Sequence, residues 1–260
     1  MSVYPGRYVF VAGLHRTGTS LLARLLAEHA DIATIENAPV PENEGCYLQG
    51  AIPHTALHGR PGHFATDSAQ HLIEGCAFDT LETKQRIESD WGRWFGEGST
   101  WRVEKSPVNL TRMRLYQQLF PTCQFIIILR HPAVMAAALG KWVSEDEQEL
   151  IDYGLNAYDT VAQDLPYLHS ALVIRYEDLV RKPLLPALFA FLGLEQGAPT
   201  ATKLRNGNAD YARLPSLSDG QIERASRWGY GPDGAVLPFD PIVRHPLRAV
   251  REATTRALAM

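Results

Sequence analysis

Short apolar runs and longer amphipathic stretches alternate along the first three quarters of the chain. Continuous runs of aliphatic and β-branched residues lie at Tyr8–Ala12, Gln124–Leu129 and Leu172–Arg175, and a weaker run lies at Trp101–Glu104. Runs of this kind are typical of parallel strands that are covered on both faces. We therefore expect these segments to form one buried sheet.

Helical periodicity fills the intervals between these runs. The expected helices are Thr19–His29, Asn109–Phe120, Ala133–Val143, about Leu150–Leu168 and Leu184–Leu192, and a basic helix follows residue 246. Buried strands that alternate with amphipathic helices predict an α/β fold. In such a fold a mostly parallel central sheet is flanked by helices, which gives three layers.

Two regions lack this periodicity. Residues 34–66 are rich in Pro, Gly, His and Glu, so we expect a long surface excursion there. Irregular segments of such length are usually functional or disordered. Residues 197–218 are similarly irregular. Neither region resembles an interdomain linker, so we expect one domain over residues 1–260.

Composition narrows the classes of partner. The chain has 25 Lys+Arg and 29 Asp+Glu, a formal net charge of −4, which disfavours nucleic-acid binding. The longest apolar runs, Phe125–Leu129 and Ala133–Leu139, are far shorter than the roughly 20 residues that cross a bilayer. We see no signal peptide or anchor, and Cys46, Cys76 and Cys123 form no CxxC pair. We therefore expect a cytoplasmic protein with neither disulfides nor a zinc site, and no membrane attachment.

The clearest chemical signal is the loop Gly13–Ser20, which directly follows the first apolar run and precedes the first helix. In that setting backbone N–H groups and the helix N-terminus bind phosphate. Gly13 and Gly18 keep the G-x4-G spacing of nucleotide-binding P-loops, but Thr19 stands where those loops carry Lys. The cation has moved inside the loop, as Arg16. The expected phosphate- or sulfate-binding residues are Gly13, Arg16, Thr17, Gly18, Thr19 and Ser20.

This loop and two later segments resemble the sulfotransferases that use 3′-phosphoadenosine 5′-phosphosulfate (PAPS). In that family the loop binds the 5′-phosphosulfate, a strand-end Arg binds the 3′-phosphate, and the Tyr of a Tyr-Glu-Asp segment lies near the adenine. The segments FIIILRHP and LVIRYEDL match, which by resemblance gives these roles to Arg130 and Tyr176. The matches cover residues 8–195. We interpret Glu177 and Asp178, which follow the tyrosine, as structural.

The resemblance implies a P-loop-like fold and transfer of a sulfuryl group from PAPS to a hydroxyl of a small-molecule acceptor, without a metal. The segments EKSP and PENEGCYLQ resemble the bacterial small-molecule branch, which is related to the tyrosylprotein sulfotransferases. They place Lys105 near the transferred group and favour Glu44 as general base, with the excursion contributing to the acceptor site. Glu36 is the second candidate base, because it follows the loop at about the distance found in the tyrosylprotein branch. Glu42, His15 and His54 remain alternatives.

One position departs from the family pattern. Eight residues after the strand-end Arg the family usually has a Ser that contacts the 3′-phosphate, and this chain has Ala138. Arg205, Asn206 or Arg227 are candidates to supply that contact. Two other functions stay open: a kinase-like phosphotransferase, which Thr19 disfavours, and a non-catalytic phosphonucleotide-binding module. The acceptor and the oligomeric state are not predicted.

Overall fold

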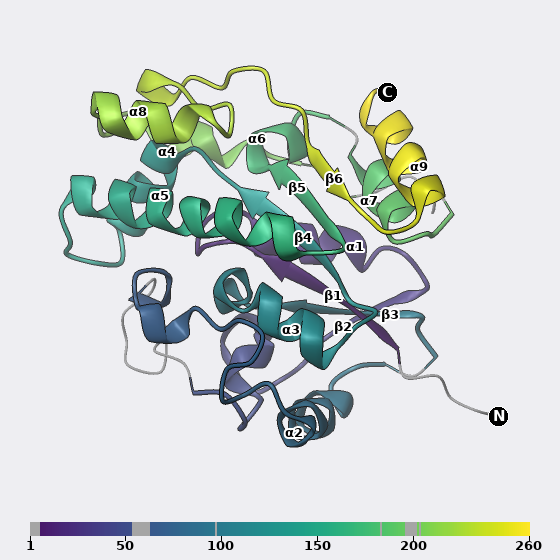
Figure 1. Ribbon diagram of the computed structural model, residues 1–260. Helices are drawn as coiled ribbons and strands as arrows, with labels where there is room; N and C mark the ends of the chain where they lie inside the picture. Colours follow the sequence, from purple (N-terminus) through teal and green to yellow (C-terminus); the bar gives the residue numbers. More distant parts are fainter. Residues whose placement is uncertain (1–5, 54–62, 97, 183, 196–201, 203) are drawn as a thin grey trace.

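The computed structural model describes residues 6–53, 63–96, 98–182, 184–195, 202 and 204–260 (Figure 1). In this part of the chain the strands form one six-stranded sheet with the order β2-β3-β1-β4-β5-β6. The strands are β1 (Arg7–Ala12), β2 (Ile32–Thr34), β3 (Trp101–Lys105), β4 (Gln124–Leu129), β5 (Ala171–Arg175) and β6 (Ile242–Arg244). All pairings are parallel except that of β6 with β5. The predicted mostly parallel sheet is confirmed.

Side chains alternate between the two faces of this sheet, and each face has its own core. Val9 and Val11 of β1 pack with the helices on one face, whereas Tyr8 and Phe10 point into the larger core on the other. The first face is covered by α1 (Thr19–Leu26), α7 (Leu185–Phe191) and α9 (Arg248–Leu258) (Figure 1). The second is covered by α2 (Leu81–Gly92), α3 (Met113–Leu119), α4 (Pro132–Leu139) and α5 (Glu147–Asp164), with α8 (Asp219–Ser226) packed on α5. The three-layer α/β architecture is therefore confirmed.

The strand order places the ends of four strands side by side. β1 lies between β3 and β4, so the chain turns to opposite sides of β1 as it builds the sheet. In open α/β sheets ligands bind outside the carboxyl ends of the strands at such a switch point. Lys105 ends β3, and Arg130 and Tyr176 directly follow β4 and β5. The fold thus brings the segments singled out in the sequence to one edge.

Several elements differ from the expectation. The short strands β2 and β6 and the helices α2 and α8 were not predicted, because each has few apolar positions of its own. The helix expected at Asn109–Phe120 is instead a 3-10 turn over Pro107–Thr111 followed by α3. α6 (Tyr176–Leu179) is a single turn after β5. None of the helices in the described residues is long and apolar enough to cross a bilayer.

The excursion after β2 is packed against the protein rather than spread over its surface. The N–H groups of Gly45 and Cys46 donate to the Glu104 carboxylate (2.9 Å) and the Ser106 hydroxyl (3.1 Å). The Trp91 indole donates to the Gly45 carbonyl (2.8 Å). These bonds satisfy the backbone of a polar segment, so burying it costs little. Glu44, Gly45 and Cys46 are therefore buried, whereas Glu36 and Glu42 of the same excursion are exposed.

Candidate functional site

The loop after β1 is closed by its own hydrogen bonds. The backbone N–H and hydroxyl of buried Thr17 both donate to the Leu14 carbonyl, at 3.2 and 2.7 Å. Gly18 has φ +101, and a Cβ there would lie 2.6 Å from the Tyr176 ring. A Cβ on Gly13 would lie 2.6 Å from the Ile128 carbonyl oxygen. Both glycines are therefore required by close contacts as well as by the spacing that revealed them.

The loop ends at the N-terminus of α1. The first intrahelical bond runs from the Leu22 N–H to the Gly18 carbonyl at 3.0 Å. The N–H groups of Thr19, Ser20 and Leu21 consequently have no carbonyl one turn earlier in α1. Such N–H groups, together with the helix dipole, favour an anion at this place.

A cavity of about 570 Å³ opens over this loop, and we call it the loop cavity. Its walls combine the P-loop-like segment, the ends of β4 and β5, and the segment 205–211. The charged side chains that line it are Arg16, Arg24, Arg130, Arg205, Glu42, Glu44 and Asp210. Cations therefore outnumber carboxylates here, although the whole chain is acidic.

Arg130 is fixed in this cavity by contacts on several sides. Its Nη1 donates to the Arg16 carbonyl (2.6 Å) and its Nε donates to Asn208 Oδ1 (2.9 Å). The guanidinium carbon lies 4.4 Å from the centre of the Tyr176 ring. A guanidinium has five N–H donors, so several remain for a bound anion. The strand-end Arg and the loop Arg are thus parts of one assembly.

Asn208 is itself held by a buried carboxylate. Its Nδ2 donates to Glu177 Oε1 at 2.9 Å. Glu177 is fully buried and also accepts from the His131 N–H and the Tyr230 hydroxyl, both at 3.1 Å. This arrangement fixes the amide of Asn208 with its oxygen toward Arg130. Sequence reasoning did not single out Asn208, and its place in an Asn-Gly-Asn turn was the available signal.

Tyr176 connects the loop to the segment 205–211. Its hydroxyl donates to the Arg205 carbonyl (3.1 Å) and accepts from the Gly207 N–H (2.8 Å). The Arg205 side chain lines the loop cavity and pairs with Asp210. The Asn206 side chain instead accepts from the Asn208 N–H at 3.0 Å.

Two positions discussed for the 3′-phosphate contact do not line the loop cavity. Arg227 is the C-cap residue of α8, and nothing places its side chain among the residues of that cavity. Ala138 is fully buried within α4, because that helix is apolar on every side, and it does not line the cavity either. A missing hydroxyl at position 138 therefore leaves no gap in the cavity wall.

Lys105 and Glu44 form a buried ion pair where β3 ends. The Lys105 Nζ lies 3.1 Å from Glu44 Oε1 and 3.0 Å from the Glu42 carbonyl, and both side chains of the pair are 8% exposed. Burial raises the pKa of Glu44 to about 7, and the nearby Lys105 charge opposes this rise. Glu44 consequently exchanges its proton near neutral pH, as a general base should.

The other candidate bases differ in their surroundings, and Glu42, which is exposed, lines the loop cavity together with Glu44. Glu36 is exposed, accepts from the Thr34 hydroxyl at 3.3 Å and does not line the loop cavity. His15 does line it, but burial, followed by the Lys105 charge, lowers its pKa to about 4, which makes it a weak base. His54 lies outside the described residues.

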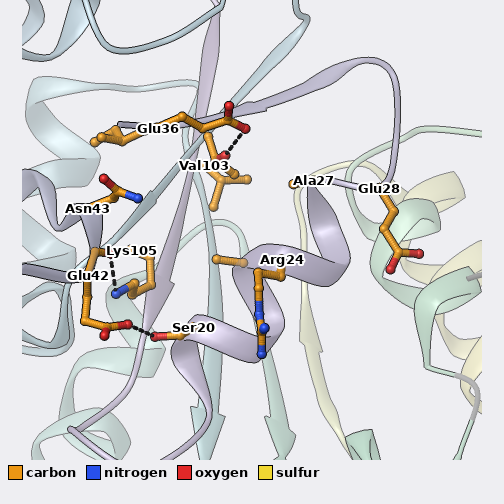
Figure 2. Close-up of a pocket in the computed structure, with 12 residues that line it drawn as sticks. Ser20, Arg24, Ala27, Glu28, Glu36, Glu42, Asn43, Val103 and Lys105 are labelled. Carbon is orange, nitrogen blue, oxygen red and sulfur yellow. Dashed lines mark hydrogen bonds between the residues drawn. The ribbon is translucent and has the colours of Figure 1, made fainter. Parts of the chain in front are cut away.

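A second cavity of about 660 Å³ adjoins the first, and we call it the helix cavity (Figure 2). It lies between one face of α1 and the segment 34–43. It is lined by Ser20, Ala23, Arg24, Ala27, Glu28, Thr34, Ile35, Glu36, Glu42, Asn43, Val103 and Lys105. Ser20, Arg24 and Glu42 line both cavities, so the two meet beside the N-terminus of α1.

Trp142 is a further cavity residue that the sequence did not indicate. Its side chain lines the loop cavity, is 55% exposed, and lies 4.5 Å beneath the guanidinium carbon of Arg16. Stacking of this kind holds an exposed arginine side chain in place without a carboxylate. Among the described residues no cluster of His, Cys, Asp or Glu is arranged to hold a metal ion.

Comparison with known proteins identifies the family. A sequence profile of the sulfotransferase family matches residues 8–197, and the chain belongs to this family. No curated protein matches the sequence. A sulfotransferase from Mycobacterium tuberculosis is 16% identical and matches over 85% of this chain and 77% of its own, with a TM-score of 0.52. One from Mycobacterium avium is 16% identical over 81% and 70% of the two chains, with a TM-score of 0.51.

These likenesses confirm the fold of the sulfotransferases, and the family match confirms the resemblance that the loop and strand-end motifs indicated. The protein is a sulfotransferase.

Proposed function

We propose that this sulfotransferase takes its sulfuryl group from PAPS and transfers it to a hydroxyl of a small molecule. The loop cavity carries the proposal, because Arg16, Arg130 and Arg205 line it together with the N-terminus of α1. PAPS has anionic groups at two separated places, the 5′-phosphosulfate and the 3′-phosphate, so donor and cavity match in charge.

The residues present fit this donor. Gly13 and Gly18 let the loop pack closely against Ile128 and Tyr176, and Gly18, Thr19 and Ser20 at the N-terminus of α1 line the loop cavity. In our proposal Gly13, Arg16, Thr17, Gly18, Thr19 and Ser20 hold the phosphosulfate, and Arg130 and Arg205 hold the 3′-phosphate. Tyr176 borders the adenine.

When bound, PAPS supplies an activated sulfur: the acceptor oxygen bonds to it as the bond to the 5′-phosphate oxygen breaks, which leaves adenosine 3′,5′-bisphosphate. Glu44 accepts the hydroxyl proton of the acceptor. Lys105 has three N–H donors, of which two are directed to Glu42 and Glu44, and the third is available to a sulfuryl oxygen. Arg16 and the N-terminus of α1 stabilise the charge that develops on the leaving phosphate.

Proton transfer and charge stabilisation are coupled in this site. Once Glu44 is protonated, its attraction for Lys105 falls, because the 3.1 Å ion pair becomes an ordinary hydrogen bond. The ammonium then interacts more strongly with the transferred group. We further propose that the chain works as one domain in the cytoplasm, in keeping with its three free thiols.

Thermal denaturation with adenosine 3′,5′-bisphosphate, compared with ATP–Mg²⁺, tests the donor assignment. A ligand at 100 times its Kd stabilises a protein by about 2.7 kcal/mol. For a chain of this size that corresponds to a rise in Tm of roughly 5–10 °C. We expect this rise with the bisphosphate; a rise with ATP–Mg²⁺ alone would reject PAPS as the donor.

A further inference from the structure

We propose that the helix cavity receives the acceptor and that it selects hydroxylated molecules carrying a positively charged amine. This inference rests on the proposed function, since it takes the loop cavity as the donor site. It adds the location and the charge of the acceptor, which neither the family nor the similar structures specify.

The position of the helix cavity fits an acceptor site. Lys105 lines the helix cavity and its partner Glu44 lines the loop cavity, so this ion pair stands at the border between them. A hydroxyl group that enters from the helix cavity therefore meets the candidate base and the candidate sulfuryl-binding cation at the same place. The reaction requires this meeting of acceptor, base and donor.

The border is built from strained backbone. Glu42 and Asn43 both have left-handed backbone conformations, with φ of 52° and 53°. The Lys105 ammonium holds the Glu42 carbonyl at 3.0 Å, and the Asn43 side chain accepts from the Ala38 N–H at 3.0 Å. Non-glycine residues in this conformation cost free energy and concentrate at functional sites. The backbone conformation of Glu42 and Asn43 is thus an observation about this segment that does not depend on its charged groups.

The size and floor of the helix cavity suit a small molecule. Its volume of about 660 Å³ lies within the usual range for small-molecule sites. Ala23 of α1 and its C-cap residue Ala27, together with Ile35 and Val103, give the cavity an apolar floor. An acceptor with a compact apolar body would cover these apolar side chains and remove them from water.

The charged groups of the helix cavity are mainly carboxylates. Glu28, Glu36 and Glu42 accept hydrogen bonds from Thr202, Thr34 and Ser20, and within the described residues none of the three has a cation at ion-pair distance. The positive charge of Lys105 is already paired with the carboxylate of Glu44. Arg24 is the remaining cation, and in Figure 2 its guanidinium lies at the end of the cavity near Ser20, where the donor site begins.

Glu36 lies at the end of the helix cavity that is farther from Ser20. Figure 2 shows its carboxylate away from Ser20, Glu42 and the guanidinium of Arg24. An acceptor that displaces water from this end would lower the local dielectric constant. The electrostatic interaction between the acceptor and the Glu36 carboxylate would then be stronger. An ammonium group would then be attracted and a carboxylate repelled. Because Glu36 is exposed, we expect a preference of about 2–5-fold, the range for solvent-exposed ion pairs.

Three phenols that differ only in their end group test the inference: tyramine, 4-ethylphenol and 3-(4-hydroxyphenyl)propionate. Turnover is measured at saturating PAPS, and binding is measured by calorimetry on enzyme loaded with adenosine 3′,5′-bisphosphate. We expect kcat/KM for tyramine to exceed that for 4-ethylphenol by about 2–5-fold, mainly through KM, with the anionic phenol poorest. Glu36→Gln should bring the tyramine-to-ethylphenol ratio close to one.

Glu223→Gln is the matched control, since Glu223 is exposed on α8 and lines neither cavity. It should keep the wild-type ratio. Equal use of the three phenols, preference for the anionic one, an unchanged ratio in Glu36→Gln, or neither turnover nor binding of tyramine would each overturn the inference. The bisphosphate-induced rise in Tm separates this failure from that of the proposed function, because it does not depend on the acceptor.

Discussion

The loop cavity and the helix cavity meet at α1 but are built in different ways. The loop cavity is formed by backbone groups and strand ends, and its Arg130 is held by Asn208, which the buried Glu177 fixes in turn. The helix cavity is formed by side chains on one helix face and by an irregular segment, and its carboxylates are exposed. Arginines outnumber carboxylates in the first cavity, and carboxylates outnumber cations in the second.

This difference indicates how the two substrates are recognised. A donor that is the same in every turnover can be bound by features that many backbone contacts fix. An acceptor is chosen by a few exposed side chains, whose replacement leaves the fold intact. Substitutions at the border or in the loop cavity should therefore affect every acceptor, whereas those in the helix cavity should affect only some.

The largest effect is expected at the border between the cavities. Glu44→Gln keeps the shape of the side chain and removes the base, so kcat should fall by about 10²–10⁴-fold with any acceptor. Because the pKa of Glu44 is about 7, its basic form is lost as the pH falls below 7, and wild-type kcat should decline with it. The pH–rate profile of the variant should lack that acidic limb. A comparable loss in Glu36→Gln, with Glu44→Gln active, would transfer the role of base to the helix cavity.

A smaller but still general effect is expected at Arg16. Arg16→Ala removes a charge directed at the leaving phosphate, and loss of one such group lowers kcat by about 10²–10³-fold. The measurement is steady-state turnover with two unlike acceptors, which should lose equally. Near-normal kcat with only a raised KM for PAPS would show that Arg16 binds the donor without assisting transfer.

Arg130 should act on affinity alone, because it belongs to the part of the loop cavity remote from the sulfur. Arg130→Ala should weaken binding of adenosine 3′,5′-bisphosphate by about 10–100-fold, the equivalent of about 1.5–3 kcal/mol. AMP, which lacks the 3′-phosphate, should be affected much less. Calorimetry with both nucleotides measures the difference; equal losses would mean that Arg130 does not bind the 3′-phosphate.

The smallest effect is expected at Asn208, which contacts Arg130. Asn208→Ala removes the acceptor that orients the Nε of Arg130, so the preference for the bisphosphate over AMP should fall by about 2–10-fold. Glu223→Gln is again the control, since Glu223 is exposed on α8 and lines neither cavity. A fall in Tm without a change in that preference would assign Asn208 a purely structural role.

Much of the loop cavity could be predicted from the sequence because its signals are local. A glycine pair between a strand and a helix, and an Arg or Tyr directly after an apolar run, each lie within a few residues of the element that positions them. The periodicity of strands and helices was sufficient to predict the α/β class. The order of the strands then required that these segments meet at one edge.

The helix cavity and the choice of base depended on contacts distant in sequence. The resemblance favoured Glu44 over Glu36, but the burial of Glu44 and its pairing with Lys105, 61 residues away, became visible only in the structure. Asn208 lies 78 residues from the arginine that it orients.

The sequence by itself therefore determined the family and the fold class, and it indicated the loop after β1 as the place to expect phosphate binding. The tertiary structure decided which carboxylate is buried, which arginines share a cavity and where the acidic surface lies. The physical reason is that a pKa or a cavity wall depends on the solvent and charges around a group, and packing between distant segments sets those surroundings.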